Sequence, residues 1–543
     1  MGTSNRPRLI FALAVLFGIN TMNFYDRQTL AAVQEKVRVL WQLTDSQLGW
    51  LGTAFILLYA VVGLPLGRMA DVGRRKIILA VGCGLWSLLT FGSGFAWSFA
   101  SLFVLRLGVG VGEASCAPAA NSLIGDLVPP GQRARALAIF MLGLPVGLAL
   151  SSSVSGTIAQ YTHIQVGLHV ERPGVKADPS QPTPKIETDV QGETTGWQAS
   201  FFVAGFPGLL LALAVLFINE PVRGAADAHA PPVSGSASFG GGPAHGPPAS
   251  GGASFGASRP HDPPVSHGLS FGASIARIFS LPTMWWIIAS GALHNFNMYA
   301  LGSFLPSLLF RYHNIDVARA GQVTGLIQGV GALSIFAAGW LGDRAYRRGV
   351  SGRLHIAWIG LLAAVPCLLL SLAAPANTIW VCAAWMLPGY GLLYFYYGTV
   401  YASIQDIIEP ALRGTAMAVY FCGQYLLGAA LGPVGTGIIS DFFARREALS
   451  RGSADITGMD KAVGLHNAMY VVPLLNGILV LVIIAATMTV KSDYLRRRKR
   501  EADAAAALGF GSAGSASTQF TSERPPSINP TGIVTERNDE QPN

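Results

Sequence analysis

Twelve apolar stretches, each long enough to cross a bilayer, dominate this sequence of 543 residues. A transmembrane helix needs about 20 mainly apolar residues. Only 12% of the residues are charged, whereas soluble domains carry about 25%. We therefore predict an all-α membrane protein with twelve transmembrane helices. The predicted spans are 9–34, 46–70, 77–97, 99–124, 134–160, 198–219, 281–310, 318–341, 354–374, 378–403, 413–440 and 465–490.

Basic residues occupy the short loops on one side of the predicted membrane. They follow the second, fourth, eighth and tenth spans, and they are Arg74, Arg75, Lys76, Arg133, Arg135, Arg344, Arg347, Arg348, Arg353 and Arg413. The positive-inside rule then places both termini in the cytoplasm. Topology also accounts for the formal net charge of +8, so we expect no nucleic-acid partner. Short loops and the lack of a targeting signal lead us to expect a multi-pass protein of the cell inner (plasma) membrane.

Three segments lie outside the predicted spans. Residues 161–197 form a predicted external loop, residues 220–275 a cytoplasmic linker, and residues 491–543 a basic and then disordered cytoplasmic tail. The linker repeats the pattern His-x-Pro-Pro-x-Ser three times between residues 229 and 266. We interpret it as a flexible Pro/Gly/Ser tether, with a weak metal-binding tract as the alternative.

The loop motif after the second span returns after the eighth. Gly67-Arg-Met-Ala-Asp-Val-Gly-Arg-Arg-Lys76 resembles Gly339-Trp-Leu-Gly-Asp-Arg-Ala-Tyr-Arg-Arg348, which aligns Asp71 with Asp343 and Arg75 with Arg347. Matched motifs at such a distance indicate that the two halves of the chain are related.

A second pair of motifs extends this repeat. Residues 126–138 resemble residues 406–418, with Arg133 opposite Arg413. The two pairs are separated by 272 and 280 residues, a difference that a small insertion explains. We therefore predict two parallel six-helix bundles, 1–219 and 276–490. Paired repeats of this kind are typical of alternating-access transporters, whose site lies between the halves.

Four charged side chains interrupt the first and fourth predicted spans. They are Asp26 and Arg27 in the first span, and Arg106 and Glu113 in the fourth. A charge at mid-bilayer costs about 2.5–3.5 kcal/mol on insertion scales, so it indicates a function inside the bundle. Seven residues are close to two helical turns, so Arg106 and Glu113 lie on one face, roughly 10 Å apart. The three glycines between them allow a neighbouring helix to approach closely.

These motifs together resemble a known family. Gly-x-x-x-Asp-x-x-x-Arg-[Arg/Lys] after the second span, its copy after the eighth, and the Arg-plus-Gly segment of the fourth are similar to the major facilitator superfamily. Asn23-Phe-Tyr-Asp-Arg27 with Arg106-Leu-Gly-Val-Gly-Val-Gly-Glu-Ala-Ser115 resembles its Spinster family. That resemblance implies the twelve-helix major facilitator fold and a lysolipid-like or sphingolipid-like substrate. The chain departs from the pattern at Val72 and at Ala429, which removes one expected acidic contact.

The intramembrane charges predict proton coupling. Burial favours the neutral form of a carboxyl group, and a nearby arginine favours its charged form. An arginine that moves between the open states would therefore switch the proton affinity. Our hypothesis gives the proton to Asp26 or Glu113 and makes Arg27 and Arg106 their partners. The alternative is a permanently neutralised cluster that only locks two spans together.

Two further groups of residues complete the predicted transport site. The residues expected to line the substrate cavity are Asn23, His294, Asn297, Tyr299, Tyr390 and Tyr394, although an aromatic stripe can also be simple packing. The residues expected to form a cytoplasmic gate are Asp71, Arg75, Arg133, Asp343, Arg344, Arg347 and Arg413, with topology-setting charge as the alternative. The resemblance implies that such gate contacts hold the cytoplasmic side shut.

The predicted function is secondary active transport of an amphipathic, lysolipid-like molecule, coupled to protons. The alternative substrate class is drugs or organic anions. A lipid-facing enzyme or a receptor is disfavoured, because neither needs duplicated gate motifs. No phosphate-binding loop, metal-site motif or nucleophile elbow is present, so we expect no enzyme activity, cofactor or metal. We further expect a monomer in the lipid bilayer.

Overall fold

The computed structural model describes residues 6–128, 130–162, 196–221, 271–409 and 412–507. Within these ranges the secondary structure is entirely helical, as the sequence predicts. Most of the external loop, most of the linker and the tail beyond residue 507 lie outside the described residues, as do the side chains of Asp71 and Arg133.

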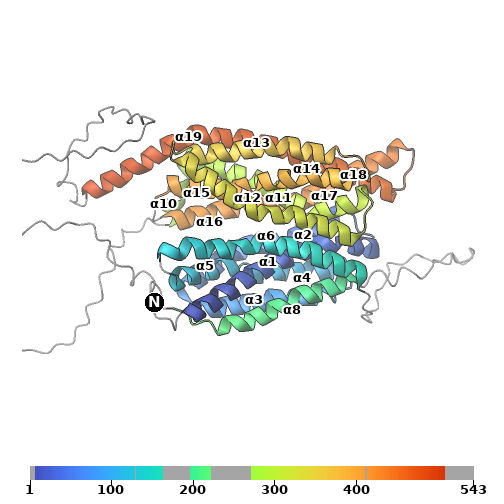
Figure 1. Ribbon diagram of the computed structural model, residues 1–543, viewed down its shortest axis with the longest axis horizontal. Coiled ribbons are helices and arrows are strands. Elements are labelled where there is room, and N and C mark those ends of the chain that lie inside the picture. Colours follow the sequence, from blue (N-terminus) through green and yellow to red (C-terminus); the bar gives the residue numbers. More distant parts are fainter. Residues whose placement is uncertain (1–5, 129, 163–195, 222–270, 410–411, 508–543) are drawn as a thin grey trace, which may run out of the picture. The chain divides into compact units, whose positions relative to one another are not determined.

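The described helices fall into two sets along the chain. The first set contains α1 (Arg6–Trp41), α2 (Asp45–Val72), α3 (Arg75–Ser93), α4 (Phe99–Glu113), α5 (Cys116–Leu127), α6 (Pro130–Tyr161) and α8 (Gly196–Leu216). The second set contains α10 (Phe271–Phe279), α11 (Pro282–Tyr312), α12 (Val317–Tyr346), α13 (Gly352–Leu372), α14 (Ile379–Leu393), α15 (Phe395–Ile407), α16 (Arg413–Gln424), the π-helix η2 (Tyr425–Ala429), α17 (Leu431–Ser450), α18 (Gly458–Met469) and α19 (Val471–Ala507). We call them the first and second helix sets. Figure 1 shows that their helices run side by side along one common direction.

Eleven helical segments among the described residues are long and apolar enough to cross a membrane. The predicted span that does not meet this composition test is 281–310, which is the 31-residue helix α11. α11 buries polar residues, including His294, Asn295 and Asn297, and these lower its hydropathy. A helix of this length rises about 46 Å, which exceeds the hydrocarbon thickness of a bilayer.

Four predicted spans contain more than one helix. Span 413–440 contains α16, η2 and part of α17, and span 465–490 contains the end of α18 and the start of α19. Spans 99–124 and 378–403 are each made of two helices. The first breaks at Ala114–Ser115 between α4 and α5, and the second breaks at Tyr394 between α14 and α15. Pro118 explains the first break, because it has no N–H to donate to the carbonyl of Ala114. The breaks lie 280 residues apart, which matches the spacing of the second motif pair.

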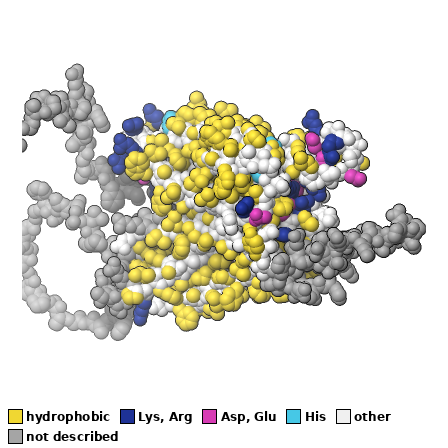
Figure 2. Space-filling model, turned by 45° about the vertical axis from the view of Figure 1, so that its right-hand side comes forward, with side chains coloured by type: hydrophobic (Ala, Val, Ile, Leu, Met, Phe, Trp, Pro, Cys, Tyr) yellow, Lys and Arg dark blue, Asp and Glu magenta, His cyan; other side chains and the backbone are white. Residues whose placement is uncertain are grey.

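The bundle has two ends with different chemistry. α1 begins, and α2, α5, α12 and α15 end, at the end that we predict to be cytoplasmic. α1 ends at Trp41 and α2 begins at Asp45 at the other end, the predicted external face. Figure 2 shows hydrophobic side chains over the middle of the molecule and charged side chains toward its ends. This distribution suits a protein surrounded by lipid.

The two helix sets pack closely near the predicted external face. A Cβ atom added to Gly321 of α12 would lie 2.2 Å from the carbonyl oxygen of Ser152 in α6. A Cβ atom on Gly49 of α2 would lie 2.5 Å from the carbonyl oxygen of Pro433 in α17. Small residues permit such crossings in membrane helices. The polar pair Ser152–Gln328, joined at 2.7 Å, strengthens the α6–α12 crossing.

The last described helix is longer than predicted. The sequence predicts that the final span ends near residue 490 and that the chain is disordered after Arg500. Instead α19 continues to Ala507. The added residues, Glu-Ala-Asp-Ala-Ala-Ala-Ala, are rich in alanine, the strongest helix former. Helix propensity therefore explains the difference for residues 501–507.

Candidate functional site

The centre of the first helix set contains a buried ion pair between α1 and α4. Arg27 Nε donates to Glu113 Oε2 at 2.6 Å. The Glu113 side chain is fully buried, and only 6% of the Arg27 side chain is exposed. The structure thus brings these two predicted residues together at the end of α4, where the helix breaks.

Aromatic rings surround the Arg27 guanidinium. Its Cζ atom lies 4.9 Å from the ring centre of Phe24, 5.3 Å from that of Phe55 and 4.6 Å from that of Tyr59. Ring faces attract a cation, more strongly where water is excluded. Arg27 Nη1 also donates to the hydroxyl of Tyr299, at 3.4 Å, from α11 of the second helix set. Arg27 therefore connects the buried carboxylate to the other half of the molecule.

Asp26 of α1 and Arg106 of α4 lie in contact with each other between the same two helices. Thr90 donates to Asp26 Oδ2 at a long 3.5 Å. Arg106 Nη1 donates at 3.3 Å to the backbone carbonyl of Asp26 rather than to its carboxylate. Both side chains are fully buried. Burying charge without full pairing is costly, so this arrangement is energetically unfavourable in this state.

Several polar atoms of this cluster have no hydrogen-bond partner. They are Asp26 Oδ1, Glu113 Oε1, Arg106 Nε and Arg106 Nη2. Asn23, one turn before Arg27, is also buried and leaves its Nδ2 without a partner. The four charged residues and Asn23 therefore form what we call the central cluster, with spare hydrogen-bonding capacity.

The glycines of α4 position this cluster as expected. A Cβ atom on Gly110 would lie 2.2 Å from the carbonyl oxygen of Phe55, so α2 passes directly against α4. A Cβ atom on Gly112 would lie 2.8 Å from the carbonyl oxygen of Gly82 in α3. The prediction that these glycines admit close neighbours is confirmed.

The predicted cavity residues of the second helix set lie in two places. Tyr299 reaches Arg27, as described above. His294 stacks on Tyr396, with ring centres 4.1 Å apart, and neither of its ring nitrogens has a partner. Asn297 is fully buried, and both polar atoms of its amide lack partners. These two residues add a second region of unsatisfied polar groups.

Tyr390 and Tyr394 lie inside the second helix set. Their ring centres are 5.4 Å apart, and both side chains are buried. A Cβ atom on Gly331 of α12 would lie 2.7 Å from the Tyr394 ring, so this ring fills the space beside that glycine. Ring contacts continue from Tyr394 to Tyr397, at 5.4 Å. The helix break at Tyr394 therefore sits within an aromatic layer.

The predicted gate residues at the cytoplasmic end pair within their own helix sets where they are described. Arg75, fully buried, contacts Asp126 and also donates to Glu220 at 3.1 Å. Asp343 accepts from Arg353 at 2.8 Å. Arg344 and Arg347 are exposed, and Arg413 is half-buried with its Nε unpartnered. Asp71 and Arg133 lie outside the described side chains.

The repeat alignment misses one partner in the second half. Arg75 contacts Asp126, and the residue that contacts the equivalent Asp406 is Arg353, at 2.5 Å, rather than the aligned Arg347. The reason is the start of the next helix: α3 begins at Arg75, whereas α13 begins at Gly352. The arginine that contacts the aspartate is therefore the one at the start of the next helix, and not the one at the aligned sequence position.

Sequence reasoning also missed residues from other elements. Phe55 and Tyr59 lie against Arg27, and Tyr425 packs on Tyr59 with ring centres 5.1 Å apart. A buried cluster around Arg311 at the predicted external face was not anticipated either. Single aromatic or charged residues in long apolar helices give no signal of their distant partners, so only the folded structure pairs them.

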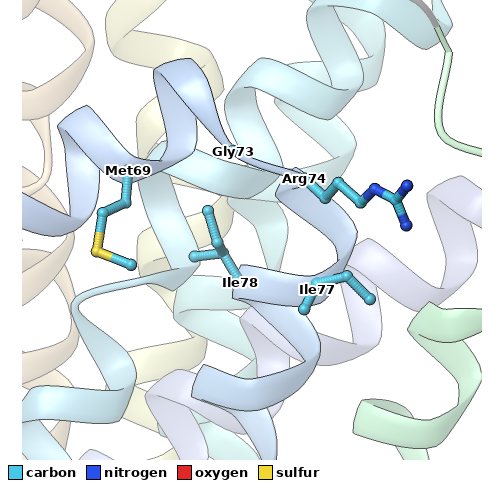
Figure 3. A pocket seen from close by; sticks show the side chains of 5 residues that line it. All are labelled: Met69, Gly73, Arg74, Ile77 and Ile78. Carbon is cyan, nitrogen blue, oxygen red and sulfur yellow. The ribbon is translucent and has the colours of Figure 1, made fainter.

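A hollow of about 300 Å³ lies elsewhere, at the junction of α2 and α3. Figure 3 shows its lining, which consists of Met69, Gly73, Arg74, Ile77 and Ile78. It is almost entirely apolar and sits at the predicted cytoplasmic end. Its residues belong to neither group of unsatisfied polar side chains, so we assign it no part in the site.

Comparison with known proteins decides the family. The family model described as Major Facilitator Superfamily matches residues 16–433. The chain belongs to the major facilitator superfamily. Protein spinster homolog 1 of Mus musculus is 30% identical over 475 residues, which cover 81% of this chain and 75% of the mouse protein. An MFS-type efflux pump of Mycolicibacterium smegmatis is 24% identical over 432 residues, which cover 79% and 84%. The predicted Spinster-like membership is confirmed.

Solved structures agree with this placement. A bacterial homolog to the human lysosomal transporter Spinster, in an inward-facing and unoccupied conformation, gives a TM-score of 0.72 at 24% identity, covering 90% of this chain and 98% of that one. A D-xylose-proton symporter shares the fold at a TM-score of 0.56 and 14% identity. This Spinster-like protein is therefore a multi-pass membrane transporter and not an enzyme.

Proposed function

We propose that this transporter couples proton movement to the transport of an amphipathic, lysolipid-like molecule by alternating access. The observation that carries the proposal is the buried Arg27–Glu113 pair, whose arginine also contacts Tyr299 of the second helix set. A charge pair at this depth is expensive to maintain, and intramembrane ionisable residues mark proton or substrate pathways.

The proposed proton coupling depends on the ion pair by which Glu113 holds Arg27 in place. Charged Glu113 holds the guanidinium against Phe24, Phe55 and Tyr59. A proton on Glu113 would remove this attraction and free Arg27. Because Arg27 also holds Tyr299, its release would weaken a link between the two helix sets. Asp26, with one oxygen unpartnered, is the second candidate proton carrier.

The proposed substrate class follows from an asymmetry across the centre. The first helix set supplies charge, and the second supplies aromatic rings with a few unsatisfied polar groups, His294 and Asn297 among them. A lysolipid has a polar head and an apolar tail, which suits both surfaces. Drugs or organic anions are the second candidate class, supported by the similarity to a mycobacterial efflux pump.

Alternating access would use the two helix sets as the moving bodies, with 1–219 and 276–490 as the two six-helix bundles. The close packing near the predicted external face supports a state that is closed there. Asp71, Arg75, Arg133, Asp343, Arg344, Arg347 and Arg413 remain the proposed gate of the cytoplasmic side. We further propose that the protein acts as a monomer in the cell inner (plasma) membrane, with both termini cytoplasmic.

The test is uptake of a labelled lysophospholipid into proteoliposomes, with and without an imposed pH gradient. We expect wild-type flux to rise with the gradient and Glu113→Gln to lose that dependence. Glu447→Gln, which changes a half-exposed acid near the predicted external end of α17, is the matched control and should behave as wild type. If folded, monodisperse wild-type protein moves no lysophospholipid but moves an organic anion, the lipid assignment is wrong.

A further inference from the structure

The predicted external face contains a second buried charge cluster, which joins the two helix sets. Arg311, at the end of α11, donates to Asp45 through both terminal nitrogens, at 2.8 Å each. It also lies 2.6 Å from Glu35 of α1. All three side chains are at most 5% exposed. A two-pronged arginine–carboxylate contact is stronger and more directional than a single ion pair.

The second helix set makes a further contact to the same point. Ser440 Oγ donates to Asp45 Oδ2 at 2.6 Å. The Asp441 carboxylate accepts the first two backbone N–H groups of α2, from Asp45 at 3.0 Å and Ser46 at 2.9 Å. These amides have no partner within their own helix, and the positive end of the helix dipole favours an anion there. α17 therefore caps α2 across the boundary between the sets.

We propose that Arg311, Glu35, Asp45, Ser440 and Asp441 form the gate of this face, which we call the Arg311 latch. Opening the face requires Arg311 to leave both carboxylates and Asp441 to leave the start of α2. The proposal rests on alternating access, because only a transporter that opens on this face has to break these contacts. It assigns gating to residues remote from the central cluster.

The latch residues are not equivalent once the face opens. Glu35 keeps a partner in its own helix, because Arg38 lies 2.9 Å from its carboxylate. The described partners of Asp45 are Arg311 and Ser440, and both belong to the second helix set. Asp45 therefore loses more on opening than Glu35. Neutralising Asp45 should shift the equilibrium toward the open state more than neutralising Glu35.

The experiment measures how fast one cysteine introduced beneath the latch reacts with a membrane-impermeant maleimide. Ser303 is suitable because its backbone carbonyl accepts from Gln34 of α1, and its hydroxyl would lie 3.3 Å from a Cβ atom on Gly52 of α2. Ser303 is half-buried in this state, so Ser303→Cys should become more accessible, and react faster, when the face opens. Ala454→Cys, exposed at the same face, reports labelling from that side in every state. The parent chain without Ser303→Cys sets the background from its five native cysteines.

We expect Asp45→Asn to raise the labelling rate of Ser303→Cys by roughly tenfold, a shift of one decade in the open population. Glu35→Gln should give a smaller increase. Arg311→Lys keeps the charge but loses the two-pronged geometry, so it should fall between wild type and Asp45→Asn. Arg319→Gln removes an exposed arginine of α12 on the same face and should leave the rate unchanged. Ala454→Cys labelling should stay constant throughout.

Wild-type labelling rates in both Asp45→Asn and Arg311→Lys, in folded protein, would overturn the latch. Because these two changes nearly preserve side-chain size, folded protein is expected for both, and their labelling rates test the latch directly. The measurement uses no substrate. A faster rate in these variants together with absent lysophospholipid flux in the wild type would therefore uphold the latch and reject the proposed substrate.

Discussion

The two buried charge clusters of this protein are built from the same residue types but differ in completeness. In the Arg311 latch, each carboxylate oxygen of Asp45 accepts from Arg311, and Asp441 accepts two helix amides. In the central cluster, one oxygen of Asp26, one oxygen of Glu113 and two nitrogens of Arg106 have no partner. A satisfied network stabilises one arrangement, whereas an unsatisfied one remains able to bind a proton or a ligand.

The clusters also differ in which parts they join. The latch spans the two helix sets with short ion pairs. The central cluster lies within the first set and reaches the second through one long contact, Arg27 to Tyr299. We infer a division of labour in which the latch holds a conformation and the central cluster couples it to protons. The predictions below test that division.

The largest effect is expected from neutralising both central carboxylates. Asp26→Asn with Glu113→Gln should abolish substrate-driven proton flux, because no intramembrane carboxyl group of the cluster would remain to carry the proton. The measurement is acidification inside proteoliposomes, followed with a pH-sensitive dye. Proton flux at the wild-type rate in this double variant would show that the cluster is only a structural ion-pair network.

The next effect comes from packing beside the latch. Gly321→Val places a side chain against the Ser152 carbonyl, and overpacking of this kind costs about 1–3 kcal/mol. We expect faster maleimide labelling of Ser303→Cys, in the same direction as Asp45→Asn. Gly339→Val is the matched control on α12, because a Cβ atom there meets nothing within 4 Å. Equal labelling rates for the two glycine variants would contradict this prediction, because they would show that the α6–α12 crossing does not affect opening of the face.

A smaller effect is expected at the contact between the central cluster and α11. Tyr299→Phe removes one hydroxyl that accepts from Arg27, and a hydrogen bond to a charged group contributes about 1.5–3 kcal/mol at best. The long distance of 3.4 Å places the effect at the lower end. We expect fewer protons moved per substrate, with substrate binding retained. Tyr425→Phe, a ring of the same aromatic group, should leave the ratio unchanged, and an equal loss in both variants would contradict a specific role for Tyr299.

The smallest effect concerns pH near the latch. Burial, together with the nearby His466, lowers the pKa of His313. The folded state therefore favours the neutral ring, so this contribution is present above about pH 6.5 and is lost as the pH falls toward the lowered pKa. The thermal unfolding midpoint should fall between pH 7 and pH 5, and His313→Gln should flatten that fall. His355→Gln, at an exposed histidine, should not.

Much of the fold could be predicted from the sequence. The apolar spans, the repeated motifs and the Gly-rich α4 are all visible as patterns in the sequence. The spans follow from the requirement to satisfy backbone groups in lipid, and the glycines from the close crossing of neighbouring helices. The pairing of Arg27 with Glu113 was within reach, because the first and fourth predicted spans are each interrupted by one basic and one acidic residue. A buried charge in an apolar helix is stabilised by an opposite charge, so only a few residues were candidate partners for Arg27.

The latch could not be predicted in the same way. Arg311 is 266 residues from Asp45 and 276 from Glu35, and all three lie at helix ends, where charge is ordinary. Their partners depend on how the two helix sets cross, which no local pattern encodes. The same limit applies to Arg353, which contacts Asp406 although Arg347 is the residue aligned with Arg75, because the start of α13 sets the contact.

The most direct test of the division of labour is the ratio of lysophospholipid uptake with a pH gradient to uptake without one. It should be measured for wild type, Glu113→Gln and Asp45→Asn in matched proteoliposomes. We predict that the ratio falls to about one in Glu113→Gln, since the variant cannot couple the proton. In Asp45→Asn the ratio should stay at the wild-type value although the absolute rate changes. A ratio that survives in Glu113→Gln, or that is lost in Asp45→Asn, would contradict the account.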